Sequence, residues 1–235
     1  MKYFYYLTII ALSLIGCSKS DTLMHLTGKV DGLKKGTLLL QKIEDTVLIS
    51  VDSVVVDGDS NFEFFTEIQS PEIYYVYVRL KDGTIIDERI PFFAEPGEIS
   101  IKTSLKNLAV KARIDGSKNQ DVLNDYKRLL NRYTNKELDQ IEANFEALKE
   151  GNDSLIDAIE SRRKSLAASK FLMTVNFAIN HKEYEAAPYL MLSEVFNTNT
   201  KYIDTVYKSL TPKIKDSKYG KVLESFTGGS KTVKN

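Results

Sequence analysis

The 235-residue sequence contains one cysteine, Cys17, two histidines and no tryptophan. A single thiol excludes an internal disulfide, a Cys-x-x-Cys redox pair and a cysteine-rich zinc site. Lysine and arginine together number 32, as do aspartate and glutamate, so the formal net charge is zero. This balance argues against nucleic acid as a partner, because a nucleic-acid surface requires a clear excess of positive charge.

Long apolar runs are also missing, except at the start of the chain. Residues 3–15 are mostly apolar and follow Lys2, but a bilayer-spanning helix needs about 20 apolar residues. The run has the proportions of a secretory signal peptide. It closes on Leu14, Ile15, Gly16 and Cys17. These four residues resemble the bacterial lipobox, in which the cysteine is acylated and the peptide bond before it is cut.

The lipobox interpretation explains where the only thiol stands. A thiolate is the nucleophile that takes up the diacylglyceryl group, and two or more acyl chains, such as palmitate, anchor a protein more stably than one. An ordinary signal peptide with a chance cysteine and a short anchor helix that is retained are the alternatives. We expect a signal peptide over residues 1–16, a lipid on Cys17 and a polar tether over residues 17–22.

A lipid on Cys17 implies a location in the cell envelope. The residue after the cysteine is Ser18. In Gram-negative lipoproteins, which this N-terminus resembles, Asp at this position is associated with retention in the inner membrane. This resemblance implies the outer membrane, with the protein facing the periplasm. Asp21 is the only acidic residue close behind Cys17, which gives little support for export to the cell surface.

Residues 23–116 have the pattern of a β domain. Short runs rich in Val, Ile, Tyr and Phe alternate with turn residues. Asp57-Gly58 is typical of a hairpin turn, and Pro96-Gly97 is typical of a type II turn. Several short strands at this spacing predict an antiparallel β-sandwich or a barrel-like domain.

From Ser117 onward the apolar period is helical, which predicts a helical segment over residues 117–226 and a flexible polar tail over residues 227–235. Thr134-Asn135-Lys136-Glu137 fits a capping box, so we expect a new helix to begin there. Gly151-Asn152 predicts a helix break. Apolar residues at 3-4-3 spacing, expected in the core of a helical bundle, are Leu138, Ile141, Phe145 and Leu148. The predicted fold class is α+β, with the helical segment packed against the β domain.

Sequence blocks in both parts resemble a known family, the domain of unknown function 4369. In chain order they are GTLLLQKI, VDSVVVDGDSNFEF, SPEIYYVYV, FFAEPGEISI and DGSKNQDVLNDYKRLL. Two later blocks, APYLMLSEV and YKSLTPKIKDSKYGKVLE, resemble the helical segment that follows this domain in envelope thiol–disulfide oxidoreductases. The likeness covers about residues 24–224 and implies a β fold and an envelope location. In those proteins a thioredoxin-like domain with a Trp-Cys-x-x-Cys site follows; this sequence has no such motif, so the redox activity does not carry over.

Other patterns of catalysis or metal binding are weak. Asp57 to Asn61 begins like a calcium loop, but Phe62 and Ile68 stand where an EF-hand requires Gly and Glu. His25 and His181 are the only histidines, and no Gly-x-Ser-x-Gly motif accompanies them. We therefore expect no metal, no cofactor and no enzymatic activity, although a pairing of His25 with a distant glutamate stays open.

Tyr75, Tyr77 and Arg79 share one face of a predicted strand. They form a possible binding face for a sugar, a peptide or a partner protein. The helices could equally cover this face, and we favour coverage because a helical layer must pack somewhere. The sequence thus predicts a membrane-anchored, non-catalytic binding or scaffolding module for an unknown envelope protein or small ligand. The alternative is an accessory subunit of a separate thioredoxin-like system.

Overall fold

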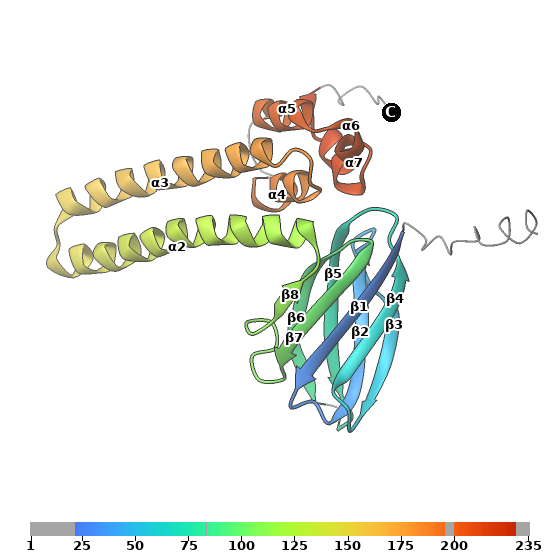
Figure 1. The fold of residues 1–235 in the computed structure, drawn as a ribbon. Helices are drawn as coiled ribbons and strands as arrows, with labels where there is room; N and C mark the ends of the chain where they lie inside the picture. The colour runs from blue at the N-terminus through green and yellow to red at the C-terminus, as the bar shows by residue number, and fades with distance from the viewer. Residues whose placement is uncertain (1–21, 83, 196–199, 229–235) are drawn as a thin grey trace, which may run out of the picture.

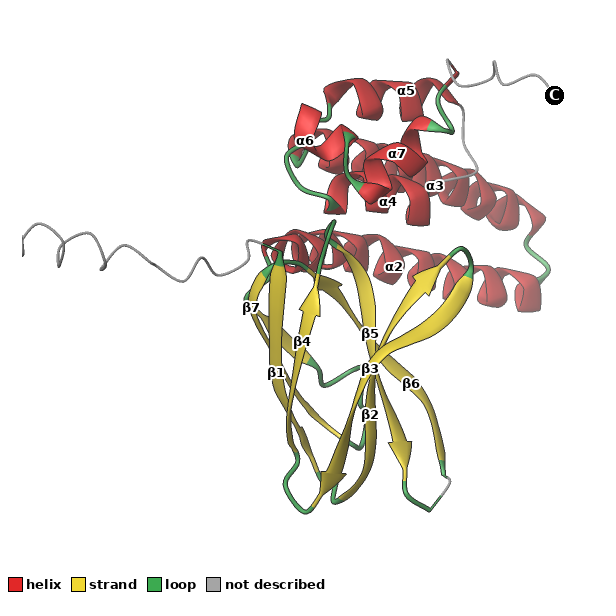
Figure 2. Cartoon of the chain, turned by 90° about the vertical axis from the view of Figure 1, so that its right-hand side faces the viewer, coloured by secondary structure: helices red, strands yellow, loops and turns green. Residues whose placement is uncertain are grey.

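The computed structural model describes residues 22–82, 84–195 and 200–228. Within these ranges two four-stranded β-sheets form a sandwich, and six helices form a layer at one end of it (Figures 1 and 2). The predicted α+β fold, a β-sandwich followed by helices, is confirmed. The predicted signal peptide, the lipobox, the tether up to Asp21 and the predicted tail from residue 229 onward lie outside the described residues.

The eight strands divide between the sheets in an order that differs from chain order. They are β1 (Leu23–Asp31), β2 (Lys35–Glu44), β3 (Val47–Asp57), β4 (Asn61–Glu67), β5 (Glu72–Leu80), β6 (Ile85–Ala94), β7 (Gly97–Ser104) and β8 (Arg113–Asp115). The first sheet has the order β4-β1-β7-β8 and the second β3-β2-β5-β6. Pairing is antiparallel except between β1 and β7, which run parallel. The chain crosses from the second sheet to the first between β6 and β7, at the end of the sandwich where β1 also starts. β7 therefore runs in the same direction as β1.

Two turns expected from the sequence connect the sheets. Asp57-Gly58 lies between β3 and β4, which belong to different sheets, so the predicted hairpin is wrong. Gly58 has a φ of 100°, which explains the glycine without requiring a hairpin. Gly97, with a φ of 121°, begins β7 after the crossing from β6. A turn motif therefore indicates the local backbone but not which strands it joins.

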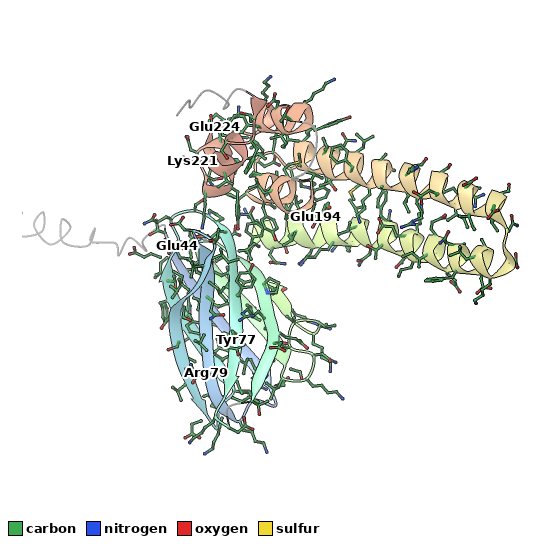
Figure 3. The ribbon with its side chains drawn as sticks, turned by 180° about the vertical axis from the view of Figure 1, so that it is seen from behind. Glu44, Tyr77, Arg79, Glu194, Lys221 and Glu224 are labelled. Atoms are coloured by element: carbon green, nitrogen blue, oxygen red, sulfur yellow. The ribbon has the colours of Figure 1, made fainter. Side chains whose placement is uncertain are left out.

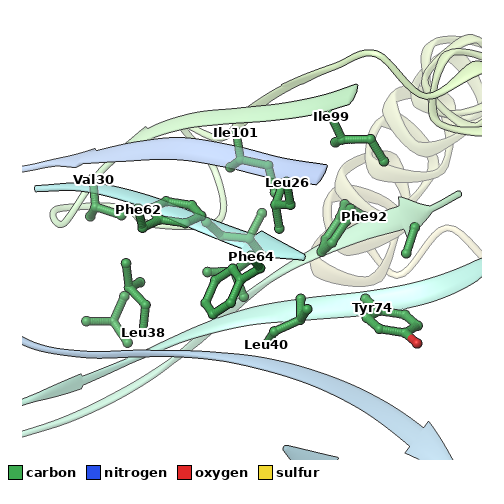
Figure 4. Close-up of a cluster of buried hydrophobic side chains, with 14 of the residues drawn as sticks. Leu26, Val30, Leu38, Leu40, Phe62, Phe64, Tyr74, Phe92, Ile99 and Ile101 are labelled. Atoms are coloured by element: carbon green, nitrogen blue, oxygen red, sulfur yellow. The ribbon is translucent and has the colours of Figure 1, made fainter. Parts of the chain in front are cut away.

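The core of the sandwich lies between the two sheets. Its side chains alternate with outward-facing ones along each strand, as a strand's period of two requires. The core includes Leu26, Val30, Leu38, Leu40, Phe62, Phe64, Tyr74, Phe92, Ile99 and Ile101 (Figure 4). Gly28 lies beside this cluster, and a Cβ atom there would approach the Phe62 ring to 2.4 Å. The absence of a side chain at Gly28 thus makes room for the Phe62 ring.

The helices are α2 (Lys118–Glu150), α3 (Asp153–Asn180), α4 (Ala186–Glu194), α5 (Thr200–Ser209), α6 (Pro212–Lys215) and α7 (Lys218–Glu224). Gly151, with a φ of 65°, ends α2, and the Asn152 side chain caps α3, so the predicted break is confirmed. The helix start predicted at Thr134 is wrong, because α2 continues through it. Its hydroxyl donates to the Leu130 carbonyl at 3.3 Å, one turn back, and is satisfied inside the helix.

A shared apolar cluster, which we call the joint, connects the sandwich to the helices. It consists of Ile73 and Phe93 from the second sheet with Val122, Leu123, Tyr126, Phe177, Ala186 and Leu190 from the helices. The Phe93 ring meets the rings of Tyr189 and Tyr219 edge-on, at centroid distances of 5.4 and 6.3 Å. Lys218 at the start of α7 forms an ion pair with Glu72 at the start of β5. The helices therefore pack on the end of the second sheet.

Two hydrogen bonds, one buried and one part-buried, cross the joint from a backbone amide to a side chain. The Phe93 amide donates to Gln120 Oε1 at 3.0 Å, and the Ile73 amide donates to the Tyr219 hydroxyl at 2.9 Å. Gln120 is only 1% exposed. A buried amide without an acceptor costs free energy, so these two contacts fix where the helices sit.

Beyond the joint, α2 and α3 continue as an antiparallel hairpin past the edge of the sandwich (Figure 1). We call residues 131–170 the arm. Along the arm α2 faces α3 mainly with polar or small side chains, while α3 contributes Ile159, which is 1% exposed. Lys170 pairs with Glu137 at 3.2 Å, the hydroxyls of Tyr133 and Ser169 lie 3.4 Å apart, and Ala147 is fully buried.

The four apolar residues of α2 expected in a bundle core lie elsewhere. Leu138, Ile141, Phe145 and Leu148 are 58, 41, 61 and 55% exposed, so the prediction of burial is wrong. Leu138 and Leu148 each follow a contact residue, Glu137 or Ala147, by one position. One position is about 100° around a helix, which turns them away from α3. We call these four residues the outer stripe.

We predict that Gln120→Ala destabilises the protein by about 1–3 kcal/mol, because the buried Phe93 amide loses its acceptor. Urea unfolding followed by circular dichroism measures the change. Asn135→Ala, on the exposed surface of the same helix, is the matched control and should change stability by less than about 0.5 kcal/mol. Equal stabilities of the two variants would contradict the role of this hydrogen bond.

Alkaline pH should also loosen the joint. Burial raises the pKa of Tyr126 to about 12 and raises that of Tyr219 well above its ordinary value. The neutral phenols are favoured in the fold, so their contribution is complete below about pH 10, the pKa of an unfolded tyrosine, and is lost as the pH rises through the folded-state pKa. We expect the urea midpoint to fall between pH 10 and pH 12. The fall should be smaller in Tyr126→Phe, and an equal fall in both proteins would refute this cause.

Candidate functional site

The predicted face of β5 lies on the outer side of the second sheet. Tyr75 packs against the joint beneath the helices, and burial raises its pKa, an effect partly offset by the positive charge of Arg89. Tyr77 and Arg79 follow further along the strand, on the part of the sandwich below the helices (Figure 3). Tyr77 is half-buried and Arg79 is exposed. The helices therefore cover the Tyr75 end of this face and leave Tyr77 and Arg79 uncovered.

Arg89 completes the uncovered part of this face. It lies opposite Tyr77 in the β5–β6 pairing, and its guanidinium carbon sits 4.8 Å from the centroid of the Tyr77 ring, a cation–π contact. Its Nε donates to Gln41 Oε1 at 3.2 Å, and the Gln41 amide donates to Ser50 Oγ at 3.2 Å. Because Gln41 is 8% exposed, the arginine is held by a buried, oriented neighbour.

A groove of about 680 Å³ is lined in part by Tyr77 and Arg79. Figure 3 places these two residues on the part of the sandwich away from the helices. We call this groove the arginine groove; its lining includes Lys35, Thr37, Val55, Asp57, Tyr77 and Arg79. Lys35 forms an ion pair with Asp57 at 3.0 Å. In the ranges that the structure describes, the Arg79 side chain has no hydrogen bond or ion pair with another residue. The groove is thus a cationic site on a protein of zero net charge.

His25 lies on the outer face of the first sheet, between two carboxylates. Its Nδ1 is 2.7 Å from Glu98 and its Nε2 is 3.4 Å from Glu63, while its ring stacks on Phe65 at a centroid distance of 4.3 Å. The structure therefore brings together the His–Glu pairing that the sequence left open. Both carboxylates are about two-thirds exposed, so these contacts are weak. Among the described residues no hydroxyl bonds to either ring nitrogen.

His181 is distant from His25 and ends α3. Its Nδ1 lies 2.8 Å from the Phe177 carbonyl oxygen, and its ring stacks on Phe177 at 4.0 Å. These contacts give it a packing role at the end of the helix. The turn after β3 is likewise structural, since Asp59 Oδ1 accepts from the Asn61 amide at 3.0 Å, as in an Asx-turn.

No group of three or more His, Cys, Asp or Glu side chains within residues 22–82, 84–195 and 200–228 is arranged to hold a metal ion. None of the helices in those same ranges combines the length and apolarity needed to cross a membrane.

The β part of the chain is similar to a known protein family. Residues 24–123, from the start of β1 to the first turns of α2, match a family described as "Domain of unknown function (DUF4369)". No curated protein matches the chain. A solved structure named "pT26-6p" is 15% identical, with a TM-score of 0.23, and the match covers 84% of this chain and 41% of that one. The chain thus spans about two fifths of that structure.

Proposed function

We propose that the protein is a lipid-anchored envelope module that binds or organises other proteins without catalysis, and that the β part, which matches the DUF4369 family over residues 24–123, serves as its rigid body. The outer stripe on the arm is the observation that carries this proposal. Four large apolar side chains, each at least 41% exposed, lie together on one helix face. Contiguous exposed apolar surface of this kind marks protein interaction sites.

The geometry of the arm suits an interaction with a protein. Residues at 3-4-3 spacing form a continuous ridge along a helix, the pattern by which helices and grooves recognise one another. Polar residues flank the ridge, among them Glu142, Glu146 and Lys149. An apolar centre with a polar rim is the ordinary composition of a protein interface. The arm's anchoring in the joint keeps this ridge at a constant angle to the sandwich.

The position of the described N-terminus fits an anchor on the same side as the helices. The Thr22 carbonyl accepts from the Ile68 amide at 2.8 Å, and Ser70, two residues on, accepts from the Lys218 amide of α7 at 3.0 Å. β1 thus starts at the helical end of the sandwich (Figure 1). Residues 17–21, fully extended, reach less than about 20 Å. A lipid on Cys17 would hold the helices and the arm close to the membrane.

We predict that a fatty-acid analogue supplied to growing cells labels the wild-type protein and does not label Cys17→Ser. The variant should also leave the membrane fraction, because the acyl chains provide the attachment. Ser18→Ala controls for substitution beside the site and should remain labelled. Label on Cys17→Ser, or an unlabelled wild type, would refute the lipid anchor. Neither result would contradict the proposal that the arm is a binding site.

We predict that Leu138→Glu combined with Phe145→Glu abolishes the capture of envelope partners crosslinked in intact cells. The substituted side chains are exposed, so stability should change by less than about 0.5 kcal/mol. Val110→Glu is the matched control, because Val110 is 86% exposed in a loop of the sandwich. Recovery of the same partners with the double variant would contradict the proposal. A recovered partner with a Cys-x-x-Cys site would favour the role of accessory subunit in a thioredoxin-like system.

A further inference from the structure

We propose that Arg79 and Arg89 form a binding site for an oxyanion, a carboxylate or phosphate group of a ligand that approaches from the aqueous side. The site lies on the outer face of the second sheet, beside the arginine groove. It is separate from the arm and does not depend on the function proposed for the arm; only the aqueous source of the ligand rests on the proposed lipid anchor.

Arg89 is oriented in a way that leaves its recognition groups available. Gln41 takes the Nε–H, and the Tyr77 ring supports the guanidinium plane. The two terminal amino groups have no partner among the described residues. A guanidinium fixed by a neutral amide and an aromatic ring keeps its full charge and offers two parallel N–H donors, the geometry that binds carboxylate and phosphate oxygens.

Arg79 supplies a second cation on the same face. It is two residues beyond Tyr77 on β5, and side chains two apart on a strand point to the same side. Asp87 lies on the neighbouring strand β6 but forms no ion pair with either arginine, and the nearby Asp57 is paired with Lys35. Glu88 accepts from the Ala109 amide at 2.9 Å. None of these three carboxylates therefore forms a salt bridge with either guanidinium group, although Asp87 shares the face of Arg89.

The position along the strand indicates where the ligand comes from. Glu72 at the start of β5 contacts Lys218 at the helical end. Arg79 stands seven residues later, and at about 3.3 Å per residue it is about 23 Å further from that end. The described chain begins at the helical end, so a lipid anchor there would direct Arg79 away from the bilayer. Lipid headgroups are thus the less suitable source of the oxyanion, and a soluble ligand or an acidic segment of a partner is the better one.

The test uses the full-length chain purified in detergent, titrated calorimetrically with sodium pyrophosphate and, in a second series, with citrate. We expect saturable binding of at least one probe, weakened by added salt. Arg79→Gln and Arg89→Gln should each reduce the affinity about tenfold or more, since each removes charge-assisted hydrogen bonds. Arg89→Lys should recover only part of the loss, because an ammonium keeps the charge without the paired donors.

Lys29→Gln is the matched control, because Lys29 is an exposed cation on the outer face of the first sheet. This variant should bind both probes with the affinity of the wild type. Thermal unfolding of each variant checks that the fold is intact. No saturable binding by the wild type, or unchanged affinity in both arginine variants, would overturn the proposal. An equal loss in Lys29→Gln would also overturn it, by showing a diffuse charge effect. Flotation with phosphatidylglycerol vesicles that needs Arg79, without binding of either soluble probe, would overturn the aqueous source.

Discussion

The contact between Gln120 and the buried amide of Phe93 constrains the rest of the structure. β6 is the outer strand of the second sheet, and Phe93 lies where this strand passes under the helices. Its amide must find an acceptor in a place that water cannot reach, and the first turn of α2 supplies it. Once that turn is fixed, the direction of the long helix follows, and so does the direction of the arm.

The joint also decides which part of the second sheet is covered. Tyr75 lies within its reach, whereas Tyr77 and Arg79 lie beyond it. Coverage by the helices is therefore local, at one end of the sandwich. A helical layer that lay across the whole sheet would have covered the ring that supports Arg89. The joint, with its two hydrogen bonds and the Lys218–Glu72 ion pair, lies at one end of the second sheet and leaves the groove side of that sheet accessible.

The sandwich could be predicted from the sequence because alternation along a strand reports directly which side chains face inward. The order of the strands could not be predicted in this way, because Asp57-Gly58 specifies a backbone turn but does not specify which sheet the next strand joins. The motif at Thr134 failed for a related reason. A capping box is a local pattern, and inside a continuous helix the same hydroxyl is satisfied by the carbonyl one turn back. Local sequence patterns thus determine the backbone conformation, whereas tertiary contacts determine which strands and helices are joined.

The two surfaces show the same limit in different ways. The 3-4-3 spacing from Leu138 to Leu148 correctly puts four residues on one helix face, but periodicity cannot say whether anything covers that face, and α3 packs on the neighbouring one. At the groove, Tyr77 and Arg79 share a face that the strand period predicts. Arg89 and Gln41 come from other strands, and only the pairing register brings them beside Tyr77.

These surfaces lie at opposite ends of a stiff body. The arm leaves the joint at the end where the described chain begins, and the arginine groove opens at the other end. The sandwich between them consists of two hydrogen-bonded sheets packed on one continuous core. The length of the sandwich therefore keeps the two surfaces at a constant distance from each other. A ligand at the groove would then not compete for space with a protein on the arm. With the lipid proposed on Cys17, the arm would meet partners near the membrane, while the groove would face the surrounding solution.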